Sequence, residues 1–571
     1  MKASYLNLTI VIMVILLFPR CSYYKNITLP GKEQAASIKP ESRYYYFTES
    51  QLERKKGNLD KAVEHLNKAI EIDPESLYLQ RELAILYLQL KDNDKALNIF
   101  EKILEKNPDN VLALILYGKL KQGLKQADDA IAAYEKVVSI DPKQENIFLL
   151  LGDLYMQEDK PDKALKTYKQ LIQNFPGSYA GHFFIGKIYA AQGKAVEAEN
   201  EFQKTLILNP NLEEPHFELI KLFKTLGKEK KIVQLYQKVL KEDPKNIRAA
   251  MGLGYYYHEK GMKEDAEKLF IDLGTRSLTQ KEVVRKVIQL YLDPKNYDAA
   301  IVVLEGMLKG APDSSDLHFV AGIAFDEKKN KDKAFVHFNK VMPDSKFYKE
   351  AAVNIAFLYQ EQGKIEEAIN YLKDVIKKIP DNPEFLLYLG SFYEEKEEFE
   401  KAENVLKKGL EIDSENTKLH FRLGVVYDKW DRKEASIEAM KTVISLDPLN
   451  ANALNYLGYT YAELGKNLDE AERLIKAALK QKPDDGYITD SLGWVYYKKG
   501  LFIKALKYLK KAVNLVPDDP IILEHLGDVY LKVSNKKKAL QFYKRSLLKK
   551  EKDKDKADLE KKIQELTGKK F

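Results

Sequence analysis

An unusual group of polar and aromatic side chains lies in residues 484–500, which read DDGYITDSLGWVYYKKG. The stretch holds Trp494, one of the chain's two tryptophans, and four further side chains of interest: Tyr487, Asp490, Tyr497 and Lys498. Tryptophan and tyrosine combine a large apolar surface with a hydrogen-bonding edge, and they are over-represented among the residues that dominate binding interfaces. This set of side chains therefore indicates binding rather than bond breaking.

No other part of the sequence has the residue spacing of a catalytic or metal site. The eight histidines form neither an HExxH pair nor a Cys/His cluster; they are His65, His182, His216, His258, His318, His337, His420 and His525. Residues 252–261, GLGYYYHEKG, begin like a glycine-rich phosphate loop but lack its third glycine and the preceding strand. We therefore expect no enzyme activity, no metal site and no cofactor.

The balance of charge argues against nucleic acid as a partner. The 93 basic and 86 acidic residues give a net charge of only +7, and Lys and Glu alternate along the chain rather than gathering in one stretch. A nucleic-acid-binding protein concentrates its basic residues on one face or stripe. The charges of this chain are those of solvated helix faces.

The first 21 residues predict export and membrane attachment. An apolar run, Leu6–Phe18, follows Lys2 and precedes Cys21, the only cysteine. Its 13 residues suit the apolar region of an export signal better than a membrane span, which needs about 17–25. The arrangement resembles the lipobox of bacterial lipoproteins, which implies acylation of Cys21 and, with Ser22 next, an outer-membrane lipoprotein facing the periplasm. Arg20 departs from the lipobox pattern, so an uncleaved membrane anchor is the alternative.

A 34-residue period begins after a linker predicted at 22–42. Asp-Pro or Asn-Pro pairs recur at this spacing, for example at Pro74, Pro108 and Pro142. Numbered from this period, fifteen repeats begin at residues 43, 77, 111, 145, 179, 213, 247, 281, 315, 349, 383, 417, 451, 486 and 520. Position 8 is usually Gly, position 11 Tyr or Phe, and position 20 Ala. Because glycine inside a helix costs about 1 kcal/mol relative to alanine, its recurrence indicates that a second helix packs closely there.

This pattern resembles the tetratricopeptide repeat (TPR) over nearly all of residues 43–551. The resemblance implies an all-α fold, an α-solenoid of about fifteen helix-turn-helix units in a right-handed superhelix. We divide the chain into a signal or anchor, a linker, N-terminal repeats, central less regular repeats, C-terminal repeats and a charged capping helix or tail, at 1–21, 22–42, 43–246, 247–350, 351–551 and 552–571. Bulky residues at small positions predict a change of curvature near 213–290, or a boundary between two sub-solenoids.

In this family, positions 2, 5, 9, 12 and 13 of the first helix face the groove. Carried onto the last three repeats, the resemblance implies a protein-binding groove of aromatic, amide and acidic side chains. Its predicted members are Asn452, Asn455, Tyr459, Tyr487, Asp490, Trp494, Tyr497, Lys498, Glu524 and Asp528. Such a groove suits an extended segment or helix with basic and apolar residues. The alternative is that Trp494 only fills space between neighbouring repeats.

Residues 455–530 also resemble the C-terminal block of a bacterial family of exported TPR lipoproteins. Its best-understood members are adaptors for a periplasmic carboxy-terminal processing protease, which implies that protease and cell-wall hydrolases as partners. We expect a membrane-tethered scaffold of the cell envelope that binds other proteins in its groove. An assembly or secretion component, in exopolysaccharide export or outer-membrane insertion, is the main alternative, and a binder of small envelope ligands is a third.

Overall fold

The computed structural model describes residues 42–550 and 553–568. The predicted signal or anchor, Cys21 and the predicted linker up to residue 41 lie outside the described residues. Within the described ranges the chain is helical throughout, with no strand. No helix there is long and apolar enough to cross a membrane.

The described part of the chain divides into two compact units, with the boundary between Lys245 and Asn246. The helices of the first are α1 (Arg43–Lys55), α2 (Leu59–Ile72), α3 (Leu77–Gln89), α4 (Asn93–Lys106), α5 (Val111–Gly123), α6 (Ala127–Ile140), α7 (Glu145–Gln157), α8 (Pro161–Asn174), α9 (Tyr179–Ala191), α10 (Ala195–Leu208), α11 (Glu214–Thr225) and α12 (Glu229–Glu242).

The second compact unit continues the same alternation of helices. Its helices are α13 (Ile247–Glu259), α14 (Lys263–Ser277), α15 (Lys281–Val287) with the π-helix η2 (Ile288–Leu292), α16 (Tyr297–Gly310), α17 (Ser315–Glu327), α18 (Lys331–Asn339), α19 (Tyr348–Glu361), α20 (Ile365–Lys378), α21 (Pro383–Glu395), α22 (Phe399–Ile412), α23 (Thr417–Lys429), α24 (Lys433–Leu446), α25 (Ala451–Glu463), α26 (Leu468–Gln481), α27 (Gly486–Lys498), α28 (Phe502–Leu515), α29 (Pro520–Lys532), α30 (Lys536–Lys549) and α31 (Asp553–Thr567).

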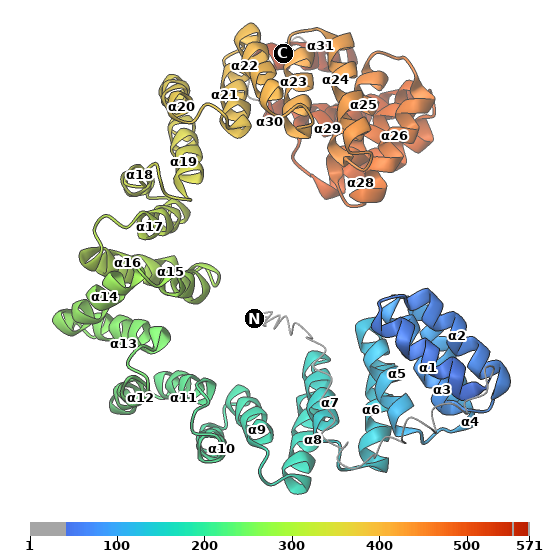
Figure 1. The fold of residues 1–571 in the computed structure, drawn as a ribbon. Helices are drawn as coiled ribbons and strands as arrows, with labels where there is room; N and C mark the ends of the chain where they lie inside the picture. Colours follow the sequence, from blue (N-terminus) through green and yellow to red (C-terminus); the bar gives the residue numbers. More distant parts are fainter. Residues whose placement is uncertain (1–41, 551–552, 569–571) are drawn as a thin grey trace. The chain divides into compact units, whose positions relative to one another are not determined.

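Each repeat is a pair of adjacent helices, which we call helix A and helix B. Figure 1 shows consecutive helices lying side by side within each pair. Every helix A begins within one residue of its predicted start; the two that differ are α11, at Glu214, and α19, at Tyr348. The predicted fold class, an all-α solenoid of helix-turn-helix repeats, is confirmed.

The glycine at position 8 marks a close approach between helix A and helix B. A Cβ atom on Gly152 would lie 2.4 Å from the ring of Tyr168, and one on Gly322 would lie 2.5 Å from the ring of Phe338. These aromatic rings occupy position 24 of their repeats. The close approach of a second helix at position 8 is thus made by the bulky side chain at position 24 of helix B.

Side-chain caps and left-handed turns set the ends of the helices. Asn110, Asn450 and Asp485 accept hydrogen bonds from backbone N–H groups of the first turn of the following helix A. Between helix A and helix B one residue takes a positive φ, as at Gly261 (+74°). A residue without a Cβ adopts this conformation without strain.

The region around residues 271–310 departs from the regular pattern. Helix α14 continues to Ser277 because no proline stops it, and α15 ends after seven residues in the π-helical turn η2. Helices α14 and α16 pack with their backbones in close contact at two glycines, Gly274 and Gly310. The predicted change of curvature near 213–290 stays a prediction.

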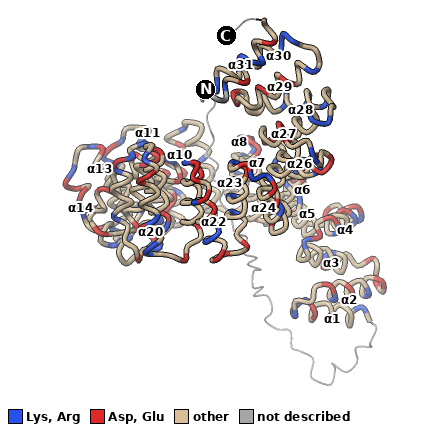
Figure 2. Tube along the Cα trace, turned by 90° about the horizontal axis from the view of Figure 1, so that it is seen from above, with Lys and Arg blue, Asp and Glu red and all other residues tan. Residues whose placement is uncertain are grey.

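Charge is distributed evenly over the described helices. Blue and red segments are interspersed along the tube in Figure 2 rather than gathered on one element. The C-terminal helix α31 begins one residue before a sixteenth repeat would start, and it buries Leu559 and Ile563 completely. It therefore packs as a further helix A onto the last repeat.

Candidate functional site

The candidate site is the side of α25, α27 and α29 that carries positions 2, 5, 9, 12 and 13. Helix α27 packs directly on both α25 and α29, and each of the three also packs on its own helix B. Asp485 and Asp519 fix the start of α27 and α29, since each accepts two hydrogen bonds of 2.9–3.0 Å from backbone N–H groups. Rigid, capped helices thus position the side chains that follow.

Trp494 is the centre of an aromatic stack that spans two repeats. The centroid of its ring lies 4.6 Å from the ring centroid of Tyr497 and 3.9 Å from that of His525, and the Trp494 ring is nearly parallel to both. Its indole N–H donates to the carboxylate of Glu463, and the Lys498 ammonium lies 5.1 Å from the ring. Only 8% of Trp494 is exposed, so its ring joins neighbouring repeats and presents little surface to a ligand.

His525 forms a buried ion pair with Asp490. The Nδ1–H of His525 lies 3.0 and 3.1 Å from the two carboxylate oxygens of Asp490, and the residues are 6% and 5% exposed. Burial by itself would lower the pKa of His525, but the charge and hydrogen bond of Asp490 outweigh it and raise that pKa above its usual value. Asp490 therefore favours the charged form of the imidazole against the stack.

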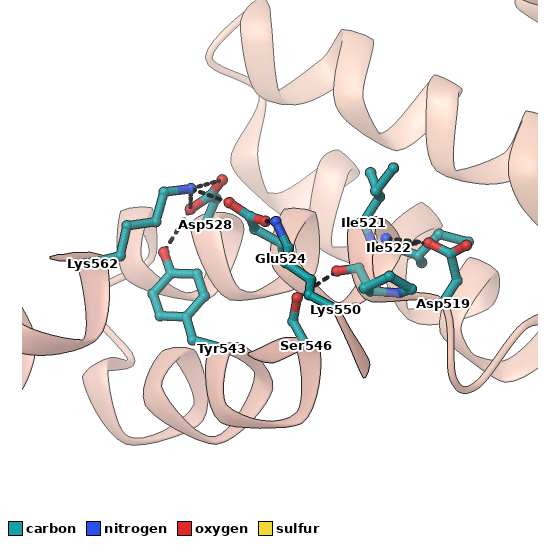
Figure 3. Close-up of polar contacts among 10 residues, drawn as sticks. Asp519, Ile521, Ile522, Glu524, Asp528, Tyr543, Ser546, Lys550 and Lys562 are labelled. Carbon is teal, nitrogen blue, oxygen red and sulfur yellow. Dashed lines mark hydrogen bonds and ion pairs between the residues drawn. The ribbon is translucent and has the colours of Figure 1, made fainter. Parts of the chain in front are cut away.

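A second cluster of charge joins α29 to the C-terminal helix (Figure 3). The Lys562 ammonium of α31 lies 2.8–2.9 Å from the carboxylate of Asp528 and 3.0 Å from that of Glu524. Tyr543 donates to Asp528 at 2.6 Å, and Lys550 lies 2.7 Å from Glu524. The two carboxylates predicted to receive a partner's basic residue thus bind a lysine of this chain.

These contacts also fix the protonation of the cluster. Burial would raise the pKa of Glu524, but the neighbouring ammonium groups of Lys550 and Lys562 outweigh that effect and lower it. Burial would likewise lower the pKa of Lys562, yet Asp528 and Glu524 raise it. Both shifts favour the charged forms of Glu524 and Lys562.

The structure separates the ten predicted groove residues into three groups. Around His525 it brings together Tyr459, Asp490, Trp494, Tyr497 and Lys498, and around Lys562 it brings together Glu524 and Asp528. Asn452 and Tyr487 are exposed, and Asn455 is half-buried with no hydrogen-bond partner for its Oδ1 atom within the described ranges. That these residues bind a protein segment stays a prediction.

Sequence reasoning missed three residues that organise the site. Glu463 lies at position 13 of its repeat, a position carried over for neighbouring repeats, and could have been included. His525 was grouped with scattered histidines, although Asp490 stands one repeat earlier at a nearby position. Lys562 lies in the charged C-terminal tail and gives no distinct signal in the sequence.

Comparison with known proteins decides the family. Two family models, both described as tetratricopeptide repeat, match residues 53–120, 121–180 and 359–423, and residues 421–486 and 491–556. Together they cover more than half of the chain. This chain belongs to the tetratricopeptide repeat family. Neither family model describes an enzyme, and a TPR scaffold is suited to protein–protein interaction.

Individual relatives match less of the chain. A TPR repeat-containing protein of Pseudomonas aeruginosa is 47% identical over 57 residues, 10% of this chain and 10% of its own length, so the chain spans about a tenth of that curated relative. A solved TPR protein from Parabacteroides merdae shares 18% identity over 45% of this chain and 99% of its own, with a TM-score of 0.38. MamA shares 31% identity over 28% of this chain and 95% of its own, with a TM-score of 0.26.

Proposed function

We propose that this TPR protein is a membrane-tethered scaffold of the bacterial cell envelope. It binds segments of other proteins on the face formed by α25, α27 and α29. The observation that supports this proposal most directly is the contact between α31 and α29, where Lys562 lies 2.8–3.0 Å from Asp528 and Glu524. That face already accommodates one helix with a basic side chain, so a partner segment of the same chemistry fits beside it.

The exposed residues next to this contact define where the partner binds. Tyr487 is 57% exposed and Ile521, at the same position of the next repeat, is 53% exposed. Both lie in the first turns of their A helices. An apolar side chain of the partner packs on this pair, and a basic side chain approaches Glu463, which is itself exposed.

The finer form of the proposal concerns the partner and the membrane. The resemblance of residues 455–530 to exported adaptor lipoproteins supports a periplasmic carboxy-terminal processing protease and cell-wall hydrolases as partners. The apolar run Leu6–Phe18 followed by Cys21 supports acylation and attachment to the outer membrane. Both points rest on sequence alone.

Site-specific photocrosslinking in bacterial cells tests the proposal. A photoreactive phenylalanine analogue at Tyr487 is expected to give crosslinked polypeptides, because the side chain stands exposed on the binding face. The matched control is the same analogue at Ile503, which is 76% exposed on helix B α28. No adduct at Tyr487, or the same adducts at both positions, would contradict the proposed face.

The identity of the adducts separates the alternatives. A protease or cell-wall hydrolase supports the adaptor form, whereas a pore or barrel protein supports an assembly or secretion component instead. In the same cells, palmitate is expected to label the wild-type chain and not Cys21→Ser. Equal labelling of both would remove the lipoprotein proposal.

A further inference from the structure

A second surface, formed by the A helices of repeats 9 to 11, is not used by the function proposed above. These helices are α17, α19 and α21. Successive residues of a helix are about 100° apart, so positions 2, 5, 9 and 13 fall within a sector about 80° wide. Positions 3, 7, 8 and 11 point the opposite way, and in α17 they are Leu317, Ala321, Gly322 and Phe325, all buried. The four positions therefore share one face, which is turned largely away from helix B. At its edge, the ring of Phe319 still lies 5.9 Å from that of Phe338 in α18 and stacks on Phe347 at 4.5 Å.

The middle of this face is apolar. Positions 5 and 9 are half-buried or exposed, and five of their six residues are apolar: Phe319, Ile323, Val353, Phe357 and Leu387. The sixth, Ser391, donates its hydroxyl hydrogen to the backbone oxygen of Leu387. Phe357 is the most accessible of them, at 36% exposed, although its ring contacts Tyr388 and Phe392 of α21 at 5.1 and 5.8 Å. This leaves a partly accessible apolar strip across three neighbouring repeats, in which Phe357 is exposed and the other four apolar residues are half-buried against the core.

Carboxylates border the apolar strip on both sides. Position 2 lies at the N-terminal end of each helix and position 13 at the C-terminal end, about 16 Å apart at 1.5 Å per residue. Position 2 carries Asp316, Glu350 and Glu384, and position 13 carries Glu327, Glu361 and Glu395. Acidic residues at the C-terminal end of a helix are disfavoured by the helix dipole, so the second row is costly for the helices that carry it.

Most of these carboxylates lack a cation. Glu361 lies 2.6 Å from Lys331, and Asp316 lies 3.7 Å from Lys346. Within residues 42–550 and 553–568, the other four have no ion pair with lysine or arginine: Glu327, Glu350, Glu384 and Glu395. A partner with basic residues would supply the missing charges.

Side-chain contacts hold the three helices together as one surface. Lys331 lies 2.6 Å from both Asp326 of α17 and Glu361 of α19, and Gln360 of α19 donates to Glu395 of α21. The surface ends at repeat 12, where positions 2 and 13 become Lys418 and Lys429. Lys429 pairs with Glu394 at 2.9 Å.

We propose that this surface binds an amphipathic α-helix that carries a row of apolar residues flanked on both sides by lysine or arginine. A helix with its side chains is about 10–12 Å wide, so it fits between carboxylate rows about 16 Å apart, and its basic side chains reach both. The apolar row packs on Phe357 and its neighbours, and the two carboxylate rows fix the orientation of the helix. The partner is a protein of this chemistry.

Fluorescence anisotropy with a synthetic peptide tests this proposal. The probe is a labelled helix of about 18 residues, five turns, with a leucine row flanked by lysines. Two control peptides carry glutamate in place of lysine, or the same residues in an order that destroys the amphipathic pattern. The full chain is expected to bind the basic peptide only, and more weakly as salt is raised above about 0.1 M.

Two sets of substitutions locate the peptide. The variant Glu327→Gln, Glu350→Gln, Glu384→Gln and Glu395→Gln is expected to bind it about tenfold more weakly, which corresponds to four exposed ion pairs of ordinary strength. The matched control makes the same charge change in the same part of the chain, at four exposed acids outside the surface: Asp381→Asn, Glu400→Gln, Glu411→Gln and Glu415→Gln. This control is expected to bind the peptide as tightly as the wild type does. The variant Phe357→Ala, which removes a ring from the proposed surface, is expected to bind the peptide more weakly than the wild type.

Several results would overturn the proposal. These are equal binding by the wild type and the first variant, equal loss in the control variant, or binding of the glutamate peptide as tight as that of the lysine peptide. A dimer of the wild-type chain that uses this surface and excludes the peptide would also overturn it. The variant Tyr487→Ala should leave peptide binding unchanged. A failure of the peptide to bind would therefore count against this surface alone, whereas the absence of crosslinks at Tyr487 would count against the proposed function alone.

Discussion

At the scale of single residues, the ion pair between Asp490 and His525 is the feature on which the candidate site depends. Both are buried, and removing one partner leaves the other charge without compensation. We expect Asp490→Asn to lower the free energy of unfolding of the C-terminal compact unit by about 3–5 kcal/mol. The double variant Asp490→Asn with His525→Gln should lose less than the sum of the single variants. Chemical denaturation followed by circular dichroism measures all three, and additive losses would show that the pair does not interact.

The same pair predicts a pH dependence with a definite sign. The folded-state pKa of His525 is raised, so its contribution to stability is fully present below the unfolded value of about 6.5 and is lost as pH rises through the folded pKa. The thermal midpoint of the wild type should therefore fall more between about pH 6 and pH 9 than that of His525→Gln. Parallel curves for the two proteins would contradict the raised pKa.

The residues of this site could be predicted only in part. The resemblance to the tetratricopeptide repeat implied that positions 5, 9, 12 and 13 share one face, and the structure brings Asp490, Trp494 and Tyr497 from these positions together around His525. The resemblance did not predict that Trp494 is buried, since that depends on how closely α25, α27 and α29 approach one another. Nor did it predict Lys562, whose contact with Asp528 requires α31 to fold back onto the last repeat.

At the scale of helices, the packing of α14 on α16 depends on two glycines outside the repeat pattern. A Cβ on Gly274 would lie 1.9 Å from the backbone oxygen of Met307, and one on Gly310 would lie 2.2 Å from that of Ile271. Because backbone atoms cannot move aside as a flexible side chain can, Gly274→Ala should destabilise the C-terminal compact unit by about 3 kcal/mol, the upper end of the usual cost of overpacking. Thermal unfolding followed by circular dichroism is the measurement.

A helical glycine with free space around it provides the control for this prediction. Gly123, near the end of α5, has no atom within 4 Å of an added Cβ. Its replacement by alanine should therefore stabilise the chain by about 0.5–1 kcal/mol, as helix propensity alone requires. A similar effect of the two substitutions would mean that the close contact between α14 and α16 is absent in solution.

The helices themselves were largely predictable from the sequence. The 34-residue register placed every helix A within one residue, because prolines, caps and position-8 glycines recur with it. Of the two A helices that begin one residue away from the prediction, α11 has Pro215 in its first turn. Helix α14 runs on to Ser277 because no proline separates it from α15. The backbone contact at Gly274 and Gly310 was not predicted, since neither glycine occupies a position that repeats.

At the scale of the whole molecule, the division between Lys245 and Asn246 predicts that the second compact unit folds by itself. In a repeat protein stability comes from contacts between neighbouring repeats, so a cut between repeats leaves most of them intact. A fragment of residues 246–571 also keeps Asn246, whose side chain caps α13 with a 2.8 Å hydrogen bond from the Ala249 N–H group. It should be helical by circular dichroism and should bind the basic amphipathic peptide as the full chain does.

A fragment beginning at Ile365 is the control, because it separates α20 from α19 and exposes Ala368, Ile369 and Leu372, which are buried in the intact chain. We expect this control fragment to aggregate. If the 246–571 fragment were unfolded, or if the control folded equally well, cooperative folding would not follow the boundary at Asn246.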